Sequence, residues 1–125
     1  MQEYIVSKVQ HFSGKAIPAP YMARQYARYL YLQSPNALTP HLRASVRRAI
    51  ERLEARGGVS TRQLELPTAQ GGRWTLCVAA PGTDWNDPKV YESAIRWAIR
   101  EENHRTGHKM NPESFARRWL ARRAI

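Results

Sequence analysis

Apolar residues recur every three to four positions in several segments of this chain, which is the pattern of helices with one buried face. The best marked of these segments is residues 39–56. Thr39 is placed to cap its first turn, Pro40 fits its first helical position, and Gly57 fits a left-handed stop. We therefore predict a helix here, whose buried stripe consists of Leu42, Val46, Ala49, Ile50 and Leu53.

Further helices are predicted on both sides of this segment. Residues 2–12 carry apolar side chains on one helical face, and "SGKAIPAP" then interrupts the helix with glycine and proline. A second helix is predicted from Tyr21 and ends in "QSPNAL", because proline disfavours helical geometry in the residue before it. Asp87 and Asn111 each precede a proline and mark the starts of two later helices, the first of which stops at Gly107.

Between these helices lie two runs with strand-like alternation, "VSTRQLEL" and "RWTLCVAA". They predict a β-hairpin whose tip is formed by the Gly-Gly pair of "PTAQGG". Leu64 and Leu66 share one face of the first strand. In the second strand Trp74, Leu76 and Val78 share one face, and Cys77 lies on the opposite face as a small, half-buried residue.

The tryptophans are predicted to pack mainly inside the protein. Trp74, Trp97 and Trp119 lie on or beside apolar stripes, whereas Trp85 lies in the loop "GTDWND" and is predicted to be exposed.

The net charge of the chain predicts that this helical domain binds a polyanion. Its 125 residues include 20 Lys and Arg but 10 Asp and Glu, a formal net charge of +10. Most of the cations are arginine, which forms paired hydrogen bonds to phosphates and guanine. A nucleic acid is therefore the favoured partner, ahead of a membrane surface and an acidic protein.

The sequence gives no sign of secretion, membrane insertion or catalysis. One cysteine permits no internal disulfide, and no apolar run is long enough to span a bilayer, so we expect a cytoplasmic, nucleoid-associated protein. His104 and His108 have a metal-binding spacing, but Gly107 interrupts the helix between them, so we expect exposed histidines. We expect no enzyme activity, cofactor, metal or small-molecule ligand, because no catalytic or phosphate-loop motif is present.

Helix, helix, basic helix and hairpin follow one another in the order of a winged helix-turn-helix. "RASVRRAIERLEARGGV" resembles the recognition helix and wing entry of bacterial winged-helix regulators, especially the GntR-like type, and "IPAPYMARQYA" resembles the start of their preceding helix. The resemblance covers about residues 2–80. It implies a mainly α fold with a small β-hairpin, in which helix 39–56 reads the major groove of double-stranded DNA as part of a transcriptional regulator.

The residue chemistry of this helix is consistent with that implication. A helix that reads base edges needs polar side chains on its outward face, near its start. The predicted contacts are Arg43, Ser45, Arg47 and Arg48 to base edges, His41 and Arg52 to phosphates, and Arg62, Gln70 and Arg73 from the wing to the backbone or minor groove.

The chain is predicted to divide into a winged helix-turn-helix domain, residues 1–80, and a helical extension, residues 81–125. Two copies are expected to pair through residues 87–125, which would give a near-palindromic operator. The alternatives are a winged-helix adaptor that inhibits a partner enzyme, and a protein that binds RNA or single-stranded nucleic acid. Extra phosphate contacts are expected from the tail arginines, Arg117, Arg118, Arg122 and Arg123.

Overall fold

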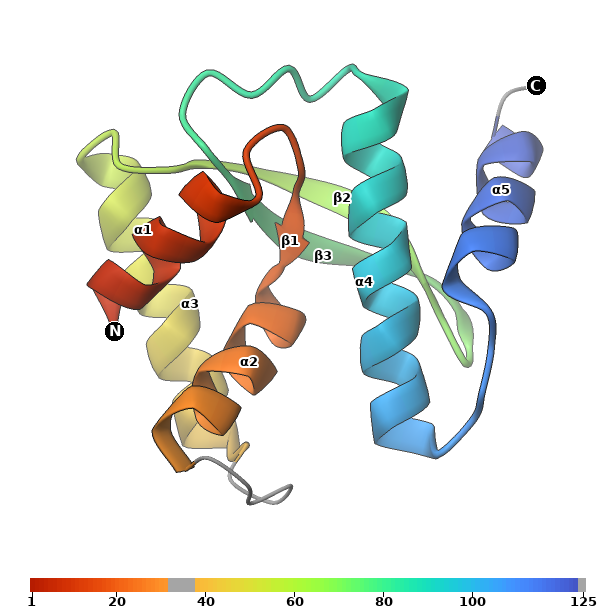
Figure 1. Cartoon of the computed structure of the whole chain (residues 1–125), viewed down its shortest axis with the longest axis horizontal. Helices are drawn as coiled ribbons and strands as arrows, with labels where there is room; N and C mark the ends of the chain where they lie inside the picture. Colours follow the sequence, from red (N-terminus) through yellow and green to blue (C-terminus); the bar gives the residue numbers. More distant parts are fainter. Residues whose placement is uncertain (32–37, 124–125) are drawn as a thin grey trace.

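The computed structural model describes residues 1–31 and 38–123 of the chain (Figure 1). The predicted end of the second helix, in "QSPNAL", falls mostly outside the described residues. The described part is mainly helical with a small antiparallel sheet, as the sequence predicts. Its elements are α1 (Gln2–His11), β1 (Ile17–Pro18), α2 (Ala19–Tyr31), α3 (Pro40–Ala55), β2 (Ser60–Thr68), β3 (Gly71–Ala79), α4 (Pro88–Thr106) and α5 (Pro112–Arg123).

The sheet differs from the predicted hairpin in two respects. It contains a third strand, because Ile17 and Pro18 pair antiparallel with β3 and give the order β1-β3-β2. The tip of the hairpin is Ala69–Gln70, since Thr68 pairs with Gly71. The prediction of a Gly-Gly tip was therefore wrong: Gly71 begins β3 with a φ of 110°, a backbone conformation that suits glycine.

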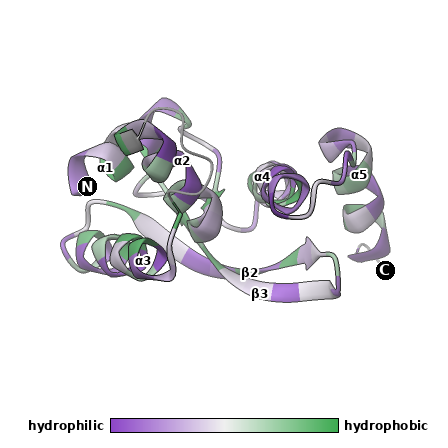
Figure 2. Cartoon of the chain, turned by 90° about the horizontal axis from the view of Figure 1, so that it is seen from below, coloured by the Kyte–Doolittle hydropathy of each residue, from purple (hydrophilic) through white to green (hydrophobic). Residues whose placement is uncertain are grey.

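Strand β3 separates two hydrophobic cores. Leu76 and Val78 face a core formed with α1, α2 and α3, whereas Cys77 and Ala79 face a core formed with α4 and α5. All four side chains are buried, so this half of β3 is covered on both faces. In Figure 2, α4 and α5 lie together over one side of the hairpin, at the end away from α3.

The helix boundaries follow the predicted capping chemistry. Thr39 Oγ1 accepts a hydrogen bond from the Leu42 amide at 3.1 Å, and Asp87 Oδ1 accepts one from the Lys89 amide at 2.9 Å. Gly107 ends α4 in the left-handed conformation, with a φ of 78°. These predictions are confirmed because each depends on local chemistry that needs no tertiary contact.

Two of the tryptophan predictions were wrong. Trp74 is 66 % exposed, because the helices that cover its face of β3 reach Leu76 and stop short of Trp74. Trp85 is half-buried, and its Nε1 donates a hydrogen bond to Ser60 Oγ at 2.8 Å. Trp97 and Trp119 are buried as predicted.

The C-terminal helices pack closely on the rest of the chain. Trp97 of α4 lies against Phe12 in edge contact, with ring centroids 5.0 Å apart, and Ser93 Oγ accepts a hydrogen bond from the Ala16 amide at 2.9 Å. The division at residue 80 stays a prediction, because close packing does not decide whether either part folds alone. None of the described helices is long and apolar enough to cross a membrane.

Polar contacts tie α5 to the outer strand of the sheet. Tyr91 donates a hydrogen bond from its hydroxyl to the Glu65 carbonyl at 2.6 Å and accepts one from Trp119 Nε1 at 3.1 Å. Arg123 forms an ion pair with the Glu65 carboxylate. Pro67 is also on this strand, opposite Gly72, where its missing N–H points away from β3.

Replacing Ile50 with alanine tests the contribution of α3 to the first core. Ile50 is fully buried, so we expect Ile50→Ala to lower the free energy of unfolding by about 2–5 kcal/mol through lost apolar contact and a residual cavity. Arg48→Ala on the exposed side of the same helix should change it by less than about 0.5 kcal/mol. Urea unfolding curves measure both, and equal effects would contradict this assignment of faces.

Candidate functional site

The exposed side of α3 carries two stripes of polar residues. The outer stripe is spaced four, three and four positions apart and consists of His41, Ser45, Arg48 and Arg52. The groove stripe is formed by Arg43 and Arg47, one helical turn apart on the side nearer the hairpin. Ser45 is half-buried, whereas His41 and the four arginines are exposed, so α3 turns five candidate side chains toward solvent.

The local contacts of these residues leave their charges available. Arg47 Nε lies 3.3 Å from Glu51 Oε1, and both side chains are more than half exposed. Arg48 Nη2 donates to Ser45 Oγ at 3.2 Å. An exposed ion pair contributes little to stability, so Arg47 can exchange Glu51 for another anion at small cost. Within the described residues, Arg43, Arg48 and Arg52 have no ion-pair partner.

A groove of about 330 Å³ separates α3 from α4. Its α3 wall is formed by Arg43, Ala44 and Arg47, and its end is closed by Pro18–Pro20. The residues between the walls come from both strands of the hairpin: 66–68 of β2 and 73–76 of β3, with the exposed indole of Trp74 among them. The α4 wall consists of Ala98, Glu101, Glu102 and Arg105.

The two carboxylates of the α4 wall are both engaged with cations. Glu101 Oε2 lies 2.6 Å from Arg24 Nε, and both side chains are about nine-tenths buried. Glu102 accepts two hydrogen bonds from Arg105, at 3.1 and 2.8 Å, and one from the Ala69 amide at 3.0 Å. The hydrogen bonds from Arg105, with a smaller contribution from Ala69, lower the pKa of Glu102 below its usual value. The α4 wall therefore adds little free negative charge to the groove.

The structure brings only part of the predicted set together. Arg43, Arg47 and Arg73 line the groove, and the outer stripe of α3 lies outside it. Arg62 and Gln70 are exposed on the hairpin and do not line the groove. The tip of the hairpin is held against α4 through Ala69, so it is not a freely projecting wing.

Sequence reasoning missed two groove residues, Trp74 and Arg105. The sequence held one signal for Trp74, because it lies four residues after the Ala69–Gln70 turn, next to Arg73 and close to two glycines. No local pattern marks Arg105, whose position depends on how α4 packs against the hairpin.

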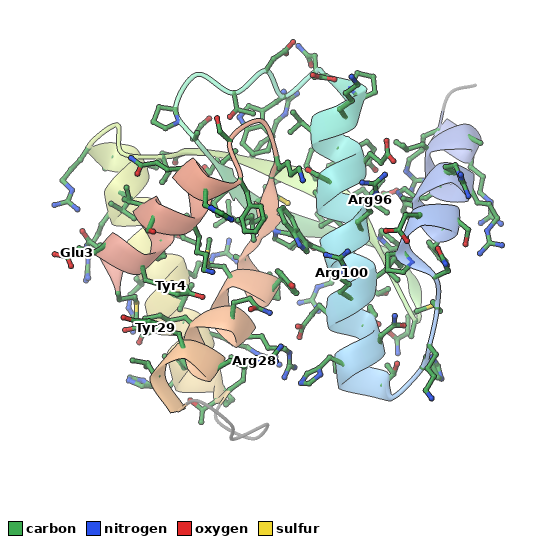
Figure 3. The ribbon with its side chains drawn as sticks, in the orientation of Figure 1. Glu3, Tyr4, Arg28, Tyr29, Arg96 and Arg100 are labelled. Atoms are coloured by element: carbon green, nitrogen blue, oxygen red, sulfur yellow. The ribbon has the colours of Figure 1, made fainter. Side chains whose placement is uncertain are left out.

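A second exposed patch lies at the end of α2 away from the sheet. Tyr4 and Tyr29 lie close together between α1 and α2 (Figure 3), with ring centroids 4.8 Å apart. Tyr29 is 63 % exposed. Burial, helped by neighbouring tyrosines, raises the pKa of Tyr4 to about 12, so its hydroxyl stays protonated near neutral pH.

The candidate metal ligands and the single cysteine lie apart from the groove. No three His, Cys, Asp or Glu side chains in residues 1–31 and 38–123 gather as metal ligands, and His104 and His108 are exposed on either side of the Gly107 stop. Cys77 is fully buried rather than half-buried as predicted, and burial raises the pKa of its thiol, which disfavours the thiolate.

Comparison with known proteins identifies no relative of this chain: no family model, no curated protein and no solved structure matches it. The residues and their geometry therefore carry the functional argument.

Replacing Glu102 with glutamine tests how the hairpin tip is held. The pKa of Glu102 lies below its ordinary 4.5 in the folded protein, so the stability from this carboxylate is present above pH 4.5 and is lost as the pH falls through the lower folded pKa. We expect Glu102→Gln to lower Tm at neutral pH, and the deficit to shrink below about pH 4. Thermal unfolding followed by circular dichroism measures this.

The matched control is Glu51→Gln, which removes an exposed carboxylate from the ion pair with Arg47 and should leave Tm nearly unchanged. A Glu102→Gln deficit that stays constant down to about pH 3 would show that the carboxylate charge is not what holds the tip.

Proposed function

We propose that the protein binds double-stranded DNA through the exposed side of α3. The observation that carries the proposal is the placement of Arg43, Arg47, Arg48 and Arg52 on one solvent-facing helix surface. Of these, only Arg47 has an ion-pair partner among the described residues, and that pair is exposed. An α-helix fits the major groove, where arginine pairs with guanine O6 and N7, and nearby arginines neutralise phosphates.

The order of elements supports a winged helix-turn-helix interpretation. Two helices precede the basic helix, and a hairpin follows it directly. In this interpretation α3 is the recognition helix and the hairpin between β2 and β3 is the wing. Because Glu102 holds the tip against α4, the wing would meet DNA through exposed side chains such as Arg62 rather than by bending its tip into a groove.

The proposal extends to a regulatory role in transcription, on the sequence resemblance alone. A dimer formed through residues 87–125 would place two copies of α3 on half-sites about one helical turn apart, near 34–36 Å. Arg117, Arg118 and Arg122 are exposed on α5 and are available for additional phosphate contacts in that arrangement.

The double substitution Arg48→Ala/Arg52→Ala tests this proposal. Both side chains lie on the outer stripe, away from the groove. Losing two phosphate-neutralising contacts should weaken duplex binding and flatten the slope of log K against log salt by about 1.8. Fluorescence anisotropy with a labelled random duplex, titrated at several salt concentrations, measures both quantities.

The matched control is Lys89→Ala/Lys109→Ala, which removes the same charge from two exposed positions, one in the first turn of α4 and one just beyond its end. If the control flattens the salt slope as much as the α3 variant, binding follows net charge and α3 has no special role. Absence of duplex binding by the folded parent protein at low salt would refute the proposal as a whole.

A further inference from the structure

The edge of β3 that faces away from β2 is only partly covered. β1 pairs with Val78 and Cys77 and then turns into α2 at Ala19, so no strand within residues 1–31 and 38–123 pairs with this edge from Gly72 to Leu76. The uncovered stretch borders the groove between α3 and α4. An uncovered strand edge of this kind presents backbone donors and acceptors that an added strand can use.

The register of the hairpin identifies which backbone groups face the groove. A two-residue turn makes Thr68 and Gly71 a hydrogen-bonded pair, so the odd-numbered residues of β3 direct their N–H and C=O groups toward β2. Val78 then points toward β1, which agrees with Pro18 lacking an N–H to donate opposite Cys77. By the same alternation, the backbone groups of Trp74 and Leu76 point into the groove.

The side walls of the groove differ in charge. Side chains of an added strand opposite Leu76 and Trp74 would share their face and meet Arg43 and Arg47 of α3. The position between them, opposite Thr75, would face the α4 wall, where Ala98 is apolar and both glutamates are engaged with arginines. The α3 wall therefore favours acidic side chains at every second position.

These features distinguish a peptide from other occupants. A second copy pairing through the same edge would bring two α3 arginine stripes together in a protein of net charge +10, which is repulsive. The backbone of a DNA strand offers phosphate oxygens that accept hydrogen bonds from the N–H groups but no donor for the carbonyls of Trp74 and Leu76, and the N–H groups of its bases do not repeat with the spacing of a β-ladder. A peptide strand supplies donors and acceptors in the required alternation.

We propose that the groove binds an extended acidic segment of a partner protein, which adds to the edge of β3 as a fourth strand in line with β1. The backbone of Trp74 and Leu76 pairs with the segment, and Arg43 and Arg47 select acidic side chains at alternate positions. The exposed Trp74 indole covers the acidic face of the segment. This site is separate from the outer stripe of α3.

A synthetic peptide of about eight residues, in which glutamate and valine alternate, tests the proposal. Fluorescence anisotropy of the labelled peptide measures affinity, and nitrogen–proton NMR spectra follow the Trp74 and Leu76 amides. We expect binding with shifts at these amides, and weaker binding of a peptide of the same composition whose glutamates are grouped at one end. Failure of the alternating peptide to bind at low salt overturns the proposal.

A proline variant and an alanine variant of Trp74 isolate the contribution of the backbone N–H to peptide affinity. Trp74→Pro removes the N–H that faces the groove and leaves the hydrogen bonds to β2 in place, whereas Trp74→Ala keeps that N–H. We expect Trp74→Pro to bind the peptide about tenfold more weakly than Trp74→Ala. Equal affinity of the two folded variants would show that no strand is added.

Should Trp74→Pro fail to fold, methylated peptides make the same comparison with the parent protein. Two peptides are compared, one methylated at its odd-numbered nitrogens and the other at its even-numbered nitrogens. Successive N–H groups of a strand point to opposite edges, so only one of the two peptides loses the N–H groups that would pair with β3. We expect one methylated peptide to lose binding and the other to keep it. Equal loss of affinity in both peptides would contradict strand addition.

Charge reversals distinguish this site from the outer stripe of α3, because Arg43 and Arg47 belong to the groove and to the proposed DNA surface. Arg43→Glu/Arg47→Glu should abolish peptide binding and also weaken duplex binding, whereas Arg48→Glu/Arg52→Glu should weaken duplex binding and leave peptide affinity unchanged. A single-stranded oligothymidine that shifts the Trp74 and Leu76 amides and displaces the peptide would instead identify a nucleic acid groove. Self-association of the parent protein that Trp74→Pro abolishes would identify a second copy as the occupant.

Discussion

The structure depends on the alternation of buried side chains along the second half of β3. Leu76 and Val78 anchor α1, α2 and α3 on one face, while Cys77 and Ala79 anchor α4 and α5 on the other. A strand buried on both faces fixes its register strongly, because a slip of one residue would exchange the two cores. These four residues place the two cores on opposite faces of the sheet, and contacts of α3 with α1 and α2, and of α4 with β1 and β2, complete the placement of the helices that border the groove.

The first half of the same strand has a different role because the helices do not cover it completely. Trp74 remains largely exposed, and its backbone and that of Leu76 face the groove. β1 is too short to continue along this edge, since the chain turns into α2 after Pro18. β3 thus contributes buried side chains to both cores and also has an uncovered edge beside the cationic helix α3.

Local chemistry was predictable from the sequence, and tertiary coverage was not. The cap of Thr39, the buried stripe with Ile50 and the stop at Gly57 follow from residue type and spacing, and the structure agrees. Ile17–Pro18 lies in a segment rich in breakers, so its pairing with β3 has no local signature. The exposure of Trp74 depends on where the covering helices end, which alternation within the strand cannot reveal.

The same distinction applies to the candidate site. Helical spacing alone predicted that the α3 arginines point outward, and they do. It could not predict that Arg43 and Arg47 form a wall opposite α4, because this depends on the packing of segments more than forty residues apart. The tie between Glu102 and Ala69, which holds the hairpin tip in place, is equally non-local.

The two edges of the sheet are protected against uncontrolled growth in different ways. Pro67 withholds a donor from the outer edge of β2, and the ion pair between Arg123 and Glu65 places α5 beside that strand. The uncovered edge of β3 is protected from pairing with a second copy by repulsion between positively charged molecules. Salt screens this repulsion over a distance of about 10 Å at 0.1 M. Repulsion between copies should therefore weaken as ionic strength rises, which favours self-association at the β3 edge.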